Sequence, residues 1–509
     1  MSFVSSQRTD IRSLQISQDV LRRKRESEAV SLRKQAREEH MQKRRIESSK
    51  NESIHYKEIM KRIHDCKILL ASQDEACMLE AVTGFQKLLS SEENPPIEEI
   101  IRCDVVGKFL EFLSHKNEDI QYMSLWAITN IAAGKHEHTQ YLYERNAIPL
   151  IIQVLLSSNS HRIQEQGCWA LGNISGDCPK FRDEVIKKGA LKIVLRLLSS
   201  EEYSSNMVRT ATWTLSNLCR GRPPPPKEIQ EAIPVASRLI YSSDPDVEVD
   251  ALWALAFLSE SLQENQQSMA EIGICKRLVL LLQSEELRYL IPTLRIIGNL
   301  MSGDDKTTQL VIDNGVLPVL TPLLSHTKIG VRKESCWTIS NVLAGPPQQI
   351  SAVLNAGIFH IILVRLHEDR EDIQHEAAWA LANAVSGSTP ELVVEFVESY
   401  GVIPHIVSLL SKCNEERLID SLLDAVDRIL LVGKKRAISS PRGVNVYLQM
   451  FDQYNAQEYI IELQAHNCRY IYIKAKKIIQ DYWGSDENSI AIDEDTSNQQ
   501  DYQWDQNPS

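Results

Sequence analysis

Residues 166–177 read QGCWALGNISGD, and the chain repeats this phrase with variations. SCWTISNVLAG begins at Ser335 and AAWALANAVSG begins at Ala377, so an asparagine again follows a tryptophan by four residues. The tryptophan place recurs every 40 to 44 residues, at Trp126, Trp169, Trp213, Trp253, Arg295, Trp337 and Trp379. A period of this length is typical of helical armadillo or HEAT units. We therefore predict a repeat protein.

Each unit also contains a second apolar segment. Examples are AIPLIIQVLLSS from Ala147, ALKIVLRLLSS from Ala190 and GVLPVLTPLLSH from Gly315. Asparagine or glycine near a proline marks the corner where such a segment begins, and no period-2 alternation persists that would indicate a sheet. We predict an all-α fold, a right-handed superhelical solenoid of about ten armadillo repeats, in which each unit packs only against its neighbours.

The composition of the 509-residue chain narrows its class. Its ten cysteines form no C-x-x-C pair and no zinc-ligand spacing, which favours reduced thiols inside the cell. The N-terminus has no apolar signal-peptide region, and no run reaches the roughly 18 apolar residues of a membrane span. We expect an intracellular chain that does not enter a membrane.

Charge is distributed unevenly along the sequence. Residues 1–50 hold 13 Lys/Arg against 7 Asp/Glu, a net charge of +6, although the whole chain carries −12. A basic arm on an acidic body favours self-association through opposite fields. A nucleic-acid-binding arm is the alternative, and we disfavour it because the acidic body would repel phosphates.

The repeated tryptophan and asparagine lie on one face of a helix, one turn apart. A lone tryptophan would be core, but a buried asparagine without partners costs about 1–3 kcal/mol, so the repetition favours an exposed concave groove. Asparagine side chains can bond the backbone of an extended peptide, and indole rings can hold a Lys or Arg stem between them. Nearby acids would select lysine, or would simply be solvated; they are Asp177, Asp250, Glu334 and Glu376.

The ladder, the Arg295 exception in LRIIGN and the phrase GNISGDCPKFRD at 172–183 resemble the importin α family of nuclear-import adaptors, from about Arg12 to Trp483. The resemblance implies a groove that binds the Lys/Arg-rich nuclear localisation signals of cargo proteins. Its major cargo site would comprise Trp126, Asn130, Thr139, Gln166, Trp169, Asn173, Asp177, Trp213, Asn217 and Asp250. Its minor cargo site would comprise Arg295, Asn299, Ser302, Asp305, Glu334, Trp337, Asn341, Glu376, Trp379 and Asn383.

Four residues depart from the family pattern. Phe257 stands beside Trp253 in the repeat that separates the two sites, Ala133 and Lys135 follow Asn130, and Thr210 precedes Trp213. They leave the relative strength of the two sites open.

The N-terminal arm resembles the importin-β-binding domain, a basic helix gripped by an acidic transport receptor. Its residues favour helix, but a helix that is polar all round is rarely stable alone and is expected to fold on binding. The residues implied in importin β binding are Arg22, Arg23, Lys24, Arg25, Arg33, Lys34, Arg37, Lys43, Arg44 and Arg45. Lys43, Arg44 and Arg45 also resemble a cargo signal, which would occupy the chain's own groove when importin β is absent.

The boundaries follow from these features. We predict the arm at 1–50, a linker at 51–66, the armadillo-repeat domain at 67–483, and a disordered tail at 484–509 with seven acids and no base. The last repeat, 459–483, resembles the unit recognised by the export receptor together with Ran-GTP. The basic stretch 434–443 is a surface loop, a phosphorylation site or a second self-binding segment.

Other function classes find little support. No G-x-G-x-x-G, P-loop or H-E-x-x-H motif indicates an enzyme or a cofactor. His136 and His138 lack further ligands in the sequence, so we predict no metal site. A β-catenin-like scaffold would favour a basic groove for acidic partners, and a passive solenoid would not need the ladder. We expect an adaptor that shuttles between cytoplasm and nucleus, with no direct contact to nucleic acid.

Overall fold

The computed structural model describes residues 56–90, 95–200, 202–441 and 443–484, and these residues form helices and no strand. The all-α prediction is therefore confirmed for this part of the chain. The predicted arm, including Lys43, Arg44 and Arg45, and all but the first residue of the predicted tail lie outside the described residues. The chain divides into two compact units, Met1–Gly387 and Ser388–Ser509.

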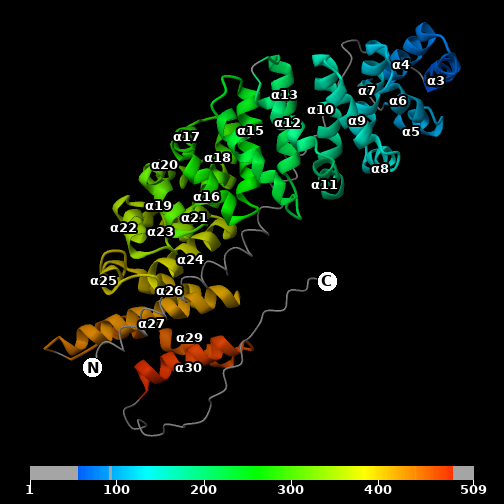
Figure 1. Ribbon diagram of the computed structural model, residues 1–509. Coiled ribbons are helices and arrows are strands. Elements are labelled where there is room, and N and C mark those ends of the chain that lie inside the picture. Colours follow the sequence, from blue (N-terminus) through cyan, green and yellow to red (C-terminus); the bar gives the residue numbers. More distant parts are fainter. Residues whose placement is uncertain (1–55, 91–94, 201, 442, 485–509) are drawn as a thin grey trace, which may run out of the picture. The chain divides into compact units, whose positions relative to one another are not determined.

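The first unit is a stack of short helices (Figure 1). In its first half the helices are α3 (Tyr56–Leu70), α4 (Glu75–Leu89), α5 (Ile97–Arg102), α6 (Val106–Phe112), α7 (Glu118–Ala132), α8 (His136–Glu144), α9 (Ala147–Ser157), α10 (His161–Ser175), α11 (Pro179–Lys187), α12 (Ala190–Leu198) and α13 (Ser205–Cys219). They continue with η1 (Lys227–Glu231), α14 (Ala232–Leu239), α15 (Pro245–Ser259), α16 (Gln263–Ile272), α17 (Cys275–Leu281), α18 (Leu287–Leu300), α19 (Asp305–Asp313), α20 (Val316–Leu323), α21 (Ile329–Val342), α22 (Pro347–Asn355), α23 (Ile358–Glu368) and α24 (Glu371–Ser386).

A typical repeat has three helices, for example α8, α9 and α10. The predicted apolar segments form the second helix of a repeat, and the corner before it requires a left-handed backbone. Gly315 reaches φ 82° before α20, and Asn146 reaches φ 55° before α9. Glycine and asparagine adopt this conformation at least cost, which explains why they mark the corners.

The first helix of each repeat was not expected from the sequence. In α8, HEHTQYLYE, only His138, Thr139 and Leu142 are buried. A nine-residue helix with so few apolar positions gives a weak periodic signal, because most of its stability comes from packing against the rest of the repeat.

The segment predicted as a linker, 51–66, differs in the structure. From Tyr56 onward it belongs to α3, whose Ile63 and Leu70 are buried, and α3 packs against α4. The apolar stripe of α3 is narrow and its other positions are polar. The sequence of this segment therefore resembles a linker, and its helix is evident only from its packing against α4.

The second unit holds the last repeats. Its helices are α25 (Pro390–Glu398), α26 (Val402–Leu410), α27 (Glu416–Ile438), α28 (Val446–Gln453), α29 (Ala456–Glu462), η2 (Leu463–Ala465) and α30 (Arg469–Trp483). The basic stretch begins inside α27, which continues to Ile438, so a loop covers only its end. Arg436 pairs with Glu398 at 2.5 Å and also bonds the hydroxyl of Tyr447. Part of this stretch is therefore a structural connection within the unit.

Among the described residues, no single helix combines the length and apolarity of a membrane span. Two sharply bent helix pairs, α22 with α23 and α25 with α26, reach that length and composition only together.

Candidate functional site

Seven helices, one from each of seven successive repeats, contain the tryptophan and asparagine places. We name them the ladder helices: α7, α10, α13, α15, α18, α21 and α24. Each packs against the next in chain order, so the pattern is repeated along one continuous row within the first unit (Figure 1). Some of these helices begin at a side-chain N-cap. The side chain of Asn117 accepts hydrogen bonds from backbone N–H groups of α7, and that of Asp244 accepts one from α15.

The six asparagines of the row are buried and connect neighbouring repeats. Asn173 Nδ2 donates to the carbonyl oxygen of Thr129 at 3.1 Å, and Asn217 Nδ2 donates to that of Gly172 at 3.0 Å. The same contact to the preceding ladder helix recurs at Asn341 with Gly298 and at Asn383 with Ser340, both at 3.4 Å. Each acceptor stands directly before the asparagine place of the preceding repeat.

Asn130 and Asn299 make the equivalent bond to a hydroxyl instead. Asn130 Nδ2 donates to Ser90 Oγ at 2.9 Å, and Asn299 Nδ2 donates to Ser259 Oγ at 2.8 Å. The expectation that the asparagines are exposed is therefore wrong. Each carboxamide nitrogen donates a hydrogen bond within the protein, which offsets part of the cost of burial.

The indoles differ in exposure along the row. Trp126 and Trp169 are half-buried, whereas Trp213, Trp337 and Trp379 are buried. The prediction of open indoles is wrong for these three; at Trp213 and Trp337 the ring lies against the preceding ladder helix. A Cβ added at Gly172 would lie 2.4 Å from Trp213 Cζ3, and one added at Gly298 would lie 2.2 Å from Trp337 Cζ3.

On each ladder helix a small residue stands directly before the asparagine place, and the sequence analysis did not identify this position. We call it the seat, because the indole of the next ladder helix can pack against it. Its members are Thr129, Gly172, Ser216, Ala256, Gly298, Ser340 and Ala382. At Gly172 and Gly298 the residue both accepts the next asparagine's bond and receives the next indole. The recurrence of small residues at this register was a visible signal for close helix contact.

On the major side of the row, the carboxylate of Asp177 lies next to the first turn of α8. Its Oδ2 is 2.5 Å from His136 Nδ1, and its side chain is 5% exposed. Gln166 Nε2 donates to Thr129 Oγ1 at 2.8 Å, and Thr139 Oγ1 donates to the carbonyl of Ala132 at 3.3 Å. Among these three predicted site residues Asp177 is the charged one, whereas Gln166 and Thr139 are neutral and form hydrogen bonds to neighbouring protein groups.

Three further major-side residues, Trp169, Trp213 and Asp250, lie on ladder helices themselves. The rings of Trp169 and Trp213 meet edge to face, with centroids 6.4 Å apart. Asp250, on α15, is buried. The two rings are therefore direct neighbours along the row.

On the minor side, Arg295 occupies the tryptophan place of α18 and is 2% exposed. Its Nε lies 3.6 Å from Glu260 Oε1, and its guanidinium carbon lies 5.5 Å from the centre of the Trp253 ring. A planar cation stacked on an indole and paired with a carboxylate substitutes for the usual ring contact. Glu260, seven residues after Trp253, was not among the predicted site residues.

The other minor-side residues are distributed over three repeats. Ser302 Oγ donates to the carbonyl of Asn299 at 2.8 Å, and Asp305 is exposed at the start of α19. Glu376 is buried on α24, and Glu334 is half-buried on α21. Three acids therefore accompany this part of the row, with unequal exposure.

An ion-pair network on the minor side connects α21 to the end of α23. Asp369 receives two hydrogen bonds from Arg332, at 2.7 and 2.8 Å, and one from Arg365 at 3.1 Å. These bonds, those from Arg332 first, lower the pKa of Asp369 from 3.8 to about 2. The carboxylate is therefore charged at any physiological pH and holds α21 against the end of α23.

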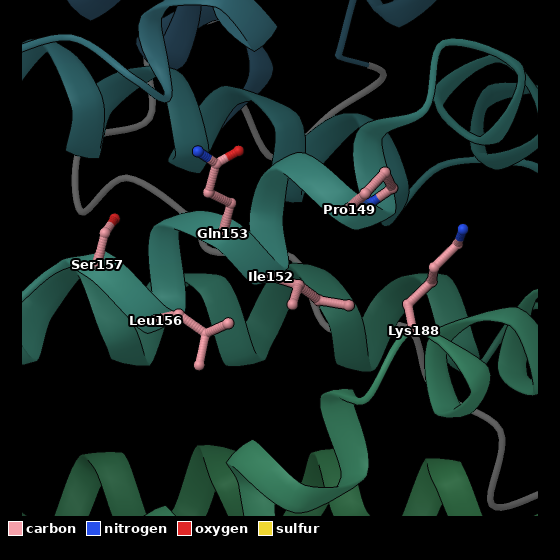
Figure 2. Close-up of a pocket in the computed structure, with 6 residues that line it drawn as sticks. All are labelled: Pro149, Ile152, Gln153, Leu156, Ser157 and Lys188. Carbon is pink, nitrogen blue, oxygen red and sulfur yellow. The ribbon is translucent and has the colours of Figure 1, made fainter.

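A pocket of about 390 Å³ lies elsewhere, on the surface of α9. Figure 2 shows its lining, in which Pro149, Ile152, Gln153, Leu156 and Ser157 follow one another along α9 and Lys188 lies near the Pro149 end. It is lined by Pro149, Ile152, Gln153, Leu156, Ser157 and Lys188. None of these residues belongs to a ladder helix.

Comparison with known proteins decides the family. Residues 12–83 match the importin beta binding domain, residues 93–133, 178–220, 304–344 and 346–386 match the armadillo/beta-catenin-like repeat, and residues 118–174 match a HEAT-like repeat. The chain is 40% identical over 522 residues to importin subunit alpha-3 of Arabidopsis thaliana, covering 99% of this chain and 98% of that protein.

This chain belongs to the importin α family. Importin subunit alpha-1a of Oryza sativa subsp. japonica is 39% identical over 96% of this chain and 95% of its own length. Importin subunit alpha-B of Dictyostelium discoideum is 42% identical over 92% of this chain and 91% of its own length. The predicted resemblance is confirmed, and it identifies a transport adaptor rather than an enzyme.

The solenoid of this importin α is also found in a solved structure. The crystal structure of an engineered protein matches 83% of this chain and 99% of that chain, with a TM-score of 0.71 and 22% identity. The match confirms the predicted armadillo-type fold.

The departures of this importin α from its family pattern have structural partners. Lys135 is exposed, and its Nζ lies 3.5 Å from Glu98. Phe257 is buried beside Trp253, with ring centroids 5.6 Å apart. The match to the importin beta binding domain runs past the predicted arm into α4, so the boundary at residue 50 is earlier than the end of that match.

Proposed function

We propose that this importin α binds extended, lysine-rich nuclear localisation signals along the row of ladder helices and links them to importin β through its N-terminal arm. The observation that carries the proposal is the row itself, with one indole or guanidinium and one carboxamide per helix over most of its length. A bound peptide with alternating side chains has a repeat of about 6.6 Å, and packed helices stand about 8–10 Å apart.

The major side is the stronger candidate for a single basic cluster. Trp126 and Trp169 retain the more exposed indoles of the row, and Asp177 follows α10, the helix that carries Trp169. The alkyl stem of a lysine packs on an indole face, and its ammonium then bonds a carboxylate. An asparagine side chain has two N–H donors and a carbonyl acceptor, the groups that pair with a peptide backbone.

The arm supplies the link to the transport receptor. Its basic residues fall within the part of the chain that matches the importin beta binding domain. When importin β is absent, Lys43, Arg44 and Arg45 occupy the major side and compete with cargo at high effective concentration. After import, the last repeat contributes to recognition by the export receptor with Ran-GTP, so the adaptor moves between nucleus and cytoplasm.

The test measures the affinity of a fluorescent peptide with one lysine cluster by anisotropy. Asp177→Asn should weaken binding by about 1.5–3 kcal/mol, the value of a hydrogen bond to a charged group. Asp313→Asn, which makes the same charge change on α19, should leave affinity unchanged. Equal affinities of the wild type and the Asp177→Asn variant would remove Asp177 from the binding site.

Two further measurements test the arm and the charges. Deleting residues 1–50 should tighten peptide binding and abolish the complex with importin β in a pull-down. The affinity should also fall with added salt, because ion pairs supply part of it. Equal peptide affinity of the full-length and arm-deleted chains would contradict autoinhibition.

A further inference from the structure

A second kind of chemistry is possible at Asp177, because two other side chains meet there. His136 comes from the first turn of α8, and Cys178 stands at the N-cap of α11 in the following repeat. One ligand atom each of His136, Asp177 and Cys178 lies within 4.8 Å of the others. The stacking of two repeats brings these groups together, although 41 residues separate His136 from Asp177.

The three donors form a set suited to a borderline-soft divalent cation. A thiolate, an imidazole and a carboxylate are the ligands of zinc, whereas magnesium and calcium take oxygen ligands. Zinc bonds of 2.0 to 2.3 Å in tetrahedral geometry place neighbouring donor atoms roughly 3.3 to 3.8 Å apart. His136 Nδ1 and Asp177 Oδ2, now at 2.5 Å, would have to separate by about 1 Å.

The surroundings allow this movement and hold the ligands near the site. The side chain of His136 is 57% exposed, so its ring can move and an ion can enter from solvent. The ring stacks on the buried ring of Phe181, with centroids 5.5 Å apart and planes 15° from parallel. Zinc sites with three protein ligands take a water molecule as the fourth ligand.

Cys178 is also better suited than the fully buried thiols of the chain. Burial raises the pKa of Cys168 to about 12 and raises the pKa of Cys219 and of Cys336, which keeps them protonated. Cys178 is half-buried at the start of α11, so its sulfur is more accessible to an ion than the sulfurs of these buried residues.

From the sequence, His136 and His138 were considered as a local pair, and no metal site was predicted. In the structure His138 is buried, and its Nδ1 accepts from the backbone N–H of Lys135, which caps α8. The partner of His136 is instead a carboxylate from the next repeat, a relation that no local spacing reveals.

We propose that His136, Asp177 and Cys178 bind zinc or a chemically similar divalent cation, and that the bound ion blocks the lysine-reading carboxylate of the major side. The regulatory half of this inference rests on the proposed function. The ion would engage the carboxylate of Asp177 and place a positive charge where a lysine ammonium is expected. Metal and basic cargo would therefore bind in competition.

Metal binding is tested first without any peptide. The full-length chain is titrated with Co²⁺, and thiolate-to-cobalt charge-transfer absorption is recorded in the near ultraviolet. Cys178→Ser should abolish this band, His136→Ala should weaken metal binding at least tenfold, and Cys103→Ser should leave the titration unchanged. Cys103 is a matched control because it is also half-buried. A band that persists in Cys178→Ser would overturn the site.

Competition is tested second, with Zn²⁺ and a labelled lysine-rich peptide that contains no histidine or cysteine. At a free Zn²⁺ concentration ten times its dissociation constant, the apparent peptide affinity of the wild type should fall about tenfold. Cys178→Ser should bind peptide normally and be insensitive to Zn²⁺. Metal binding without any effect on peptide affinity would contradict the regulatory half.

The two proposals fail in different ways. A wild-type chain that binds no peptide in the absence of metal would contradict the proposed function but leave the cobalt titration intact. A chain that binds peptide but gives no cysteine-dependent cobalt band would contradict the metal site alone.

Discussion

The two halves of the ladder share one packing device and differ in their charges. On the major side Trp213 covers Gly172, and on the minor side Trp337 covers Gly298, with nearly equal clearances. In both halves an asparagine bonds the carbonyl of the same glycine. The same contact between successive repeats, an indole on a glycine and an asparagine bonded to that glycine's carbonyl, therefore recurs in both halves.

The charged groups do not follow this repetition. The major side has a histidine beside its carboxylate, whereas the minor side begins with the buried Arg295 stacked on Trp253. The two halves thus show that the tryptophan–asparagine pattern first serves the coupling of repeats. Differences in recognition would arise from the residues that surround it.

The largest expected effect is the loss of a seated indole. Trp213→Ala and Trp337→Ala should each lower the free energy of unfolding by about 3–5 kcal/mol, because a large buried ring is replaced by a cavity. Urea denaturation followed by circular dichroism measures this loss. If one variant loses less than about 1 kcal/mol, the two halves do not share the same packing device.

Adding a methyl group to the seat should have the next largest effect. Gly172→Ala and Gly298→Ala should each cost about 1–3 kcal/mol, because the new Cβ would displace a rigid indole. The control is Gly330→Ala on α21, where a Cβ meets nothing within 4 Å. Alanine there should stabilise the chain by up to about 1 kcal/mol, through its better helix propensity. Equal changes in the free energy of unfolding for all three glycine-to-alanine variants would show that the indoles do not pack tightly against Gly172 and Gly298.

The ion pairs at the outer corners should distinguish the halves by pH. Asp369 is 2% exposed with Arg332, whereas Asp119 is 54% exposed with Arg162. Because its folded pKa is lowered, Asp369 stabilises the fold above about pH 4, and this contribution is lost as the pH falls toward 2. At pH 7, Asp369→Asn should cost about 1–2 kcal/mol.

The control for that experiment is Asp119→Asn, which should cost less than about 1 kcal/mol because its pair is exposed. Urea midpoints of the wild type and both variants at pH 7 and pH 3 give the comparison. A loss at Asp369→Asn that is the same at both pH values would show that the carboxylate charge does not contribute.

The smallest effect concerns Lys135 on the major side. Its pair with Glu98 is exposed, so Lys135→Ala should change stability by less than about 0.5 kcal/mol. Removing a positive charge near the major side should tighten a basic peptide about twofold at low salt, and not at high salt. Anisotropy measurements at two salt concentrations test this, and weaker binding would place Lys135 among the contacts to the peptide.

Sequence periodicity predicted the repeat, the all-α class and the corner residues, because these depend on local spacing and backbone preference. It also placed Trp126, Asn173 and the other ladder members in one register. It misjudged their exposure, since Asn173 seemed to need a ligand when its partner was the carbonyl of Thr129 in the preceding repeat. The hydrogen bond crosses a repeat boundary, and no local pattern encodes it.

The amino-acid sequence by itself determined the register of the ladder, the identity of each corner and the small residues that form the seats. Only the tertiary structure decided which side chains are covered and which meet, as His136, Asp177 and Cys178 do. The physical reason is that burial and coordination depend on the contact between successive repeats. That contact is set by how whole helices stack, and it is not contained in any one repeat.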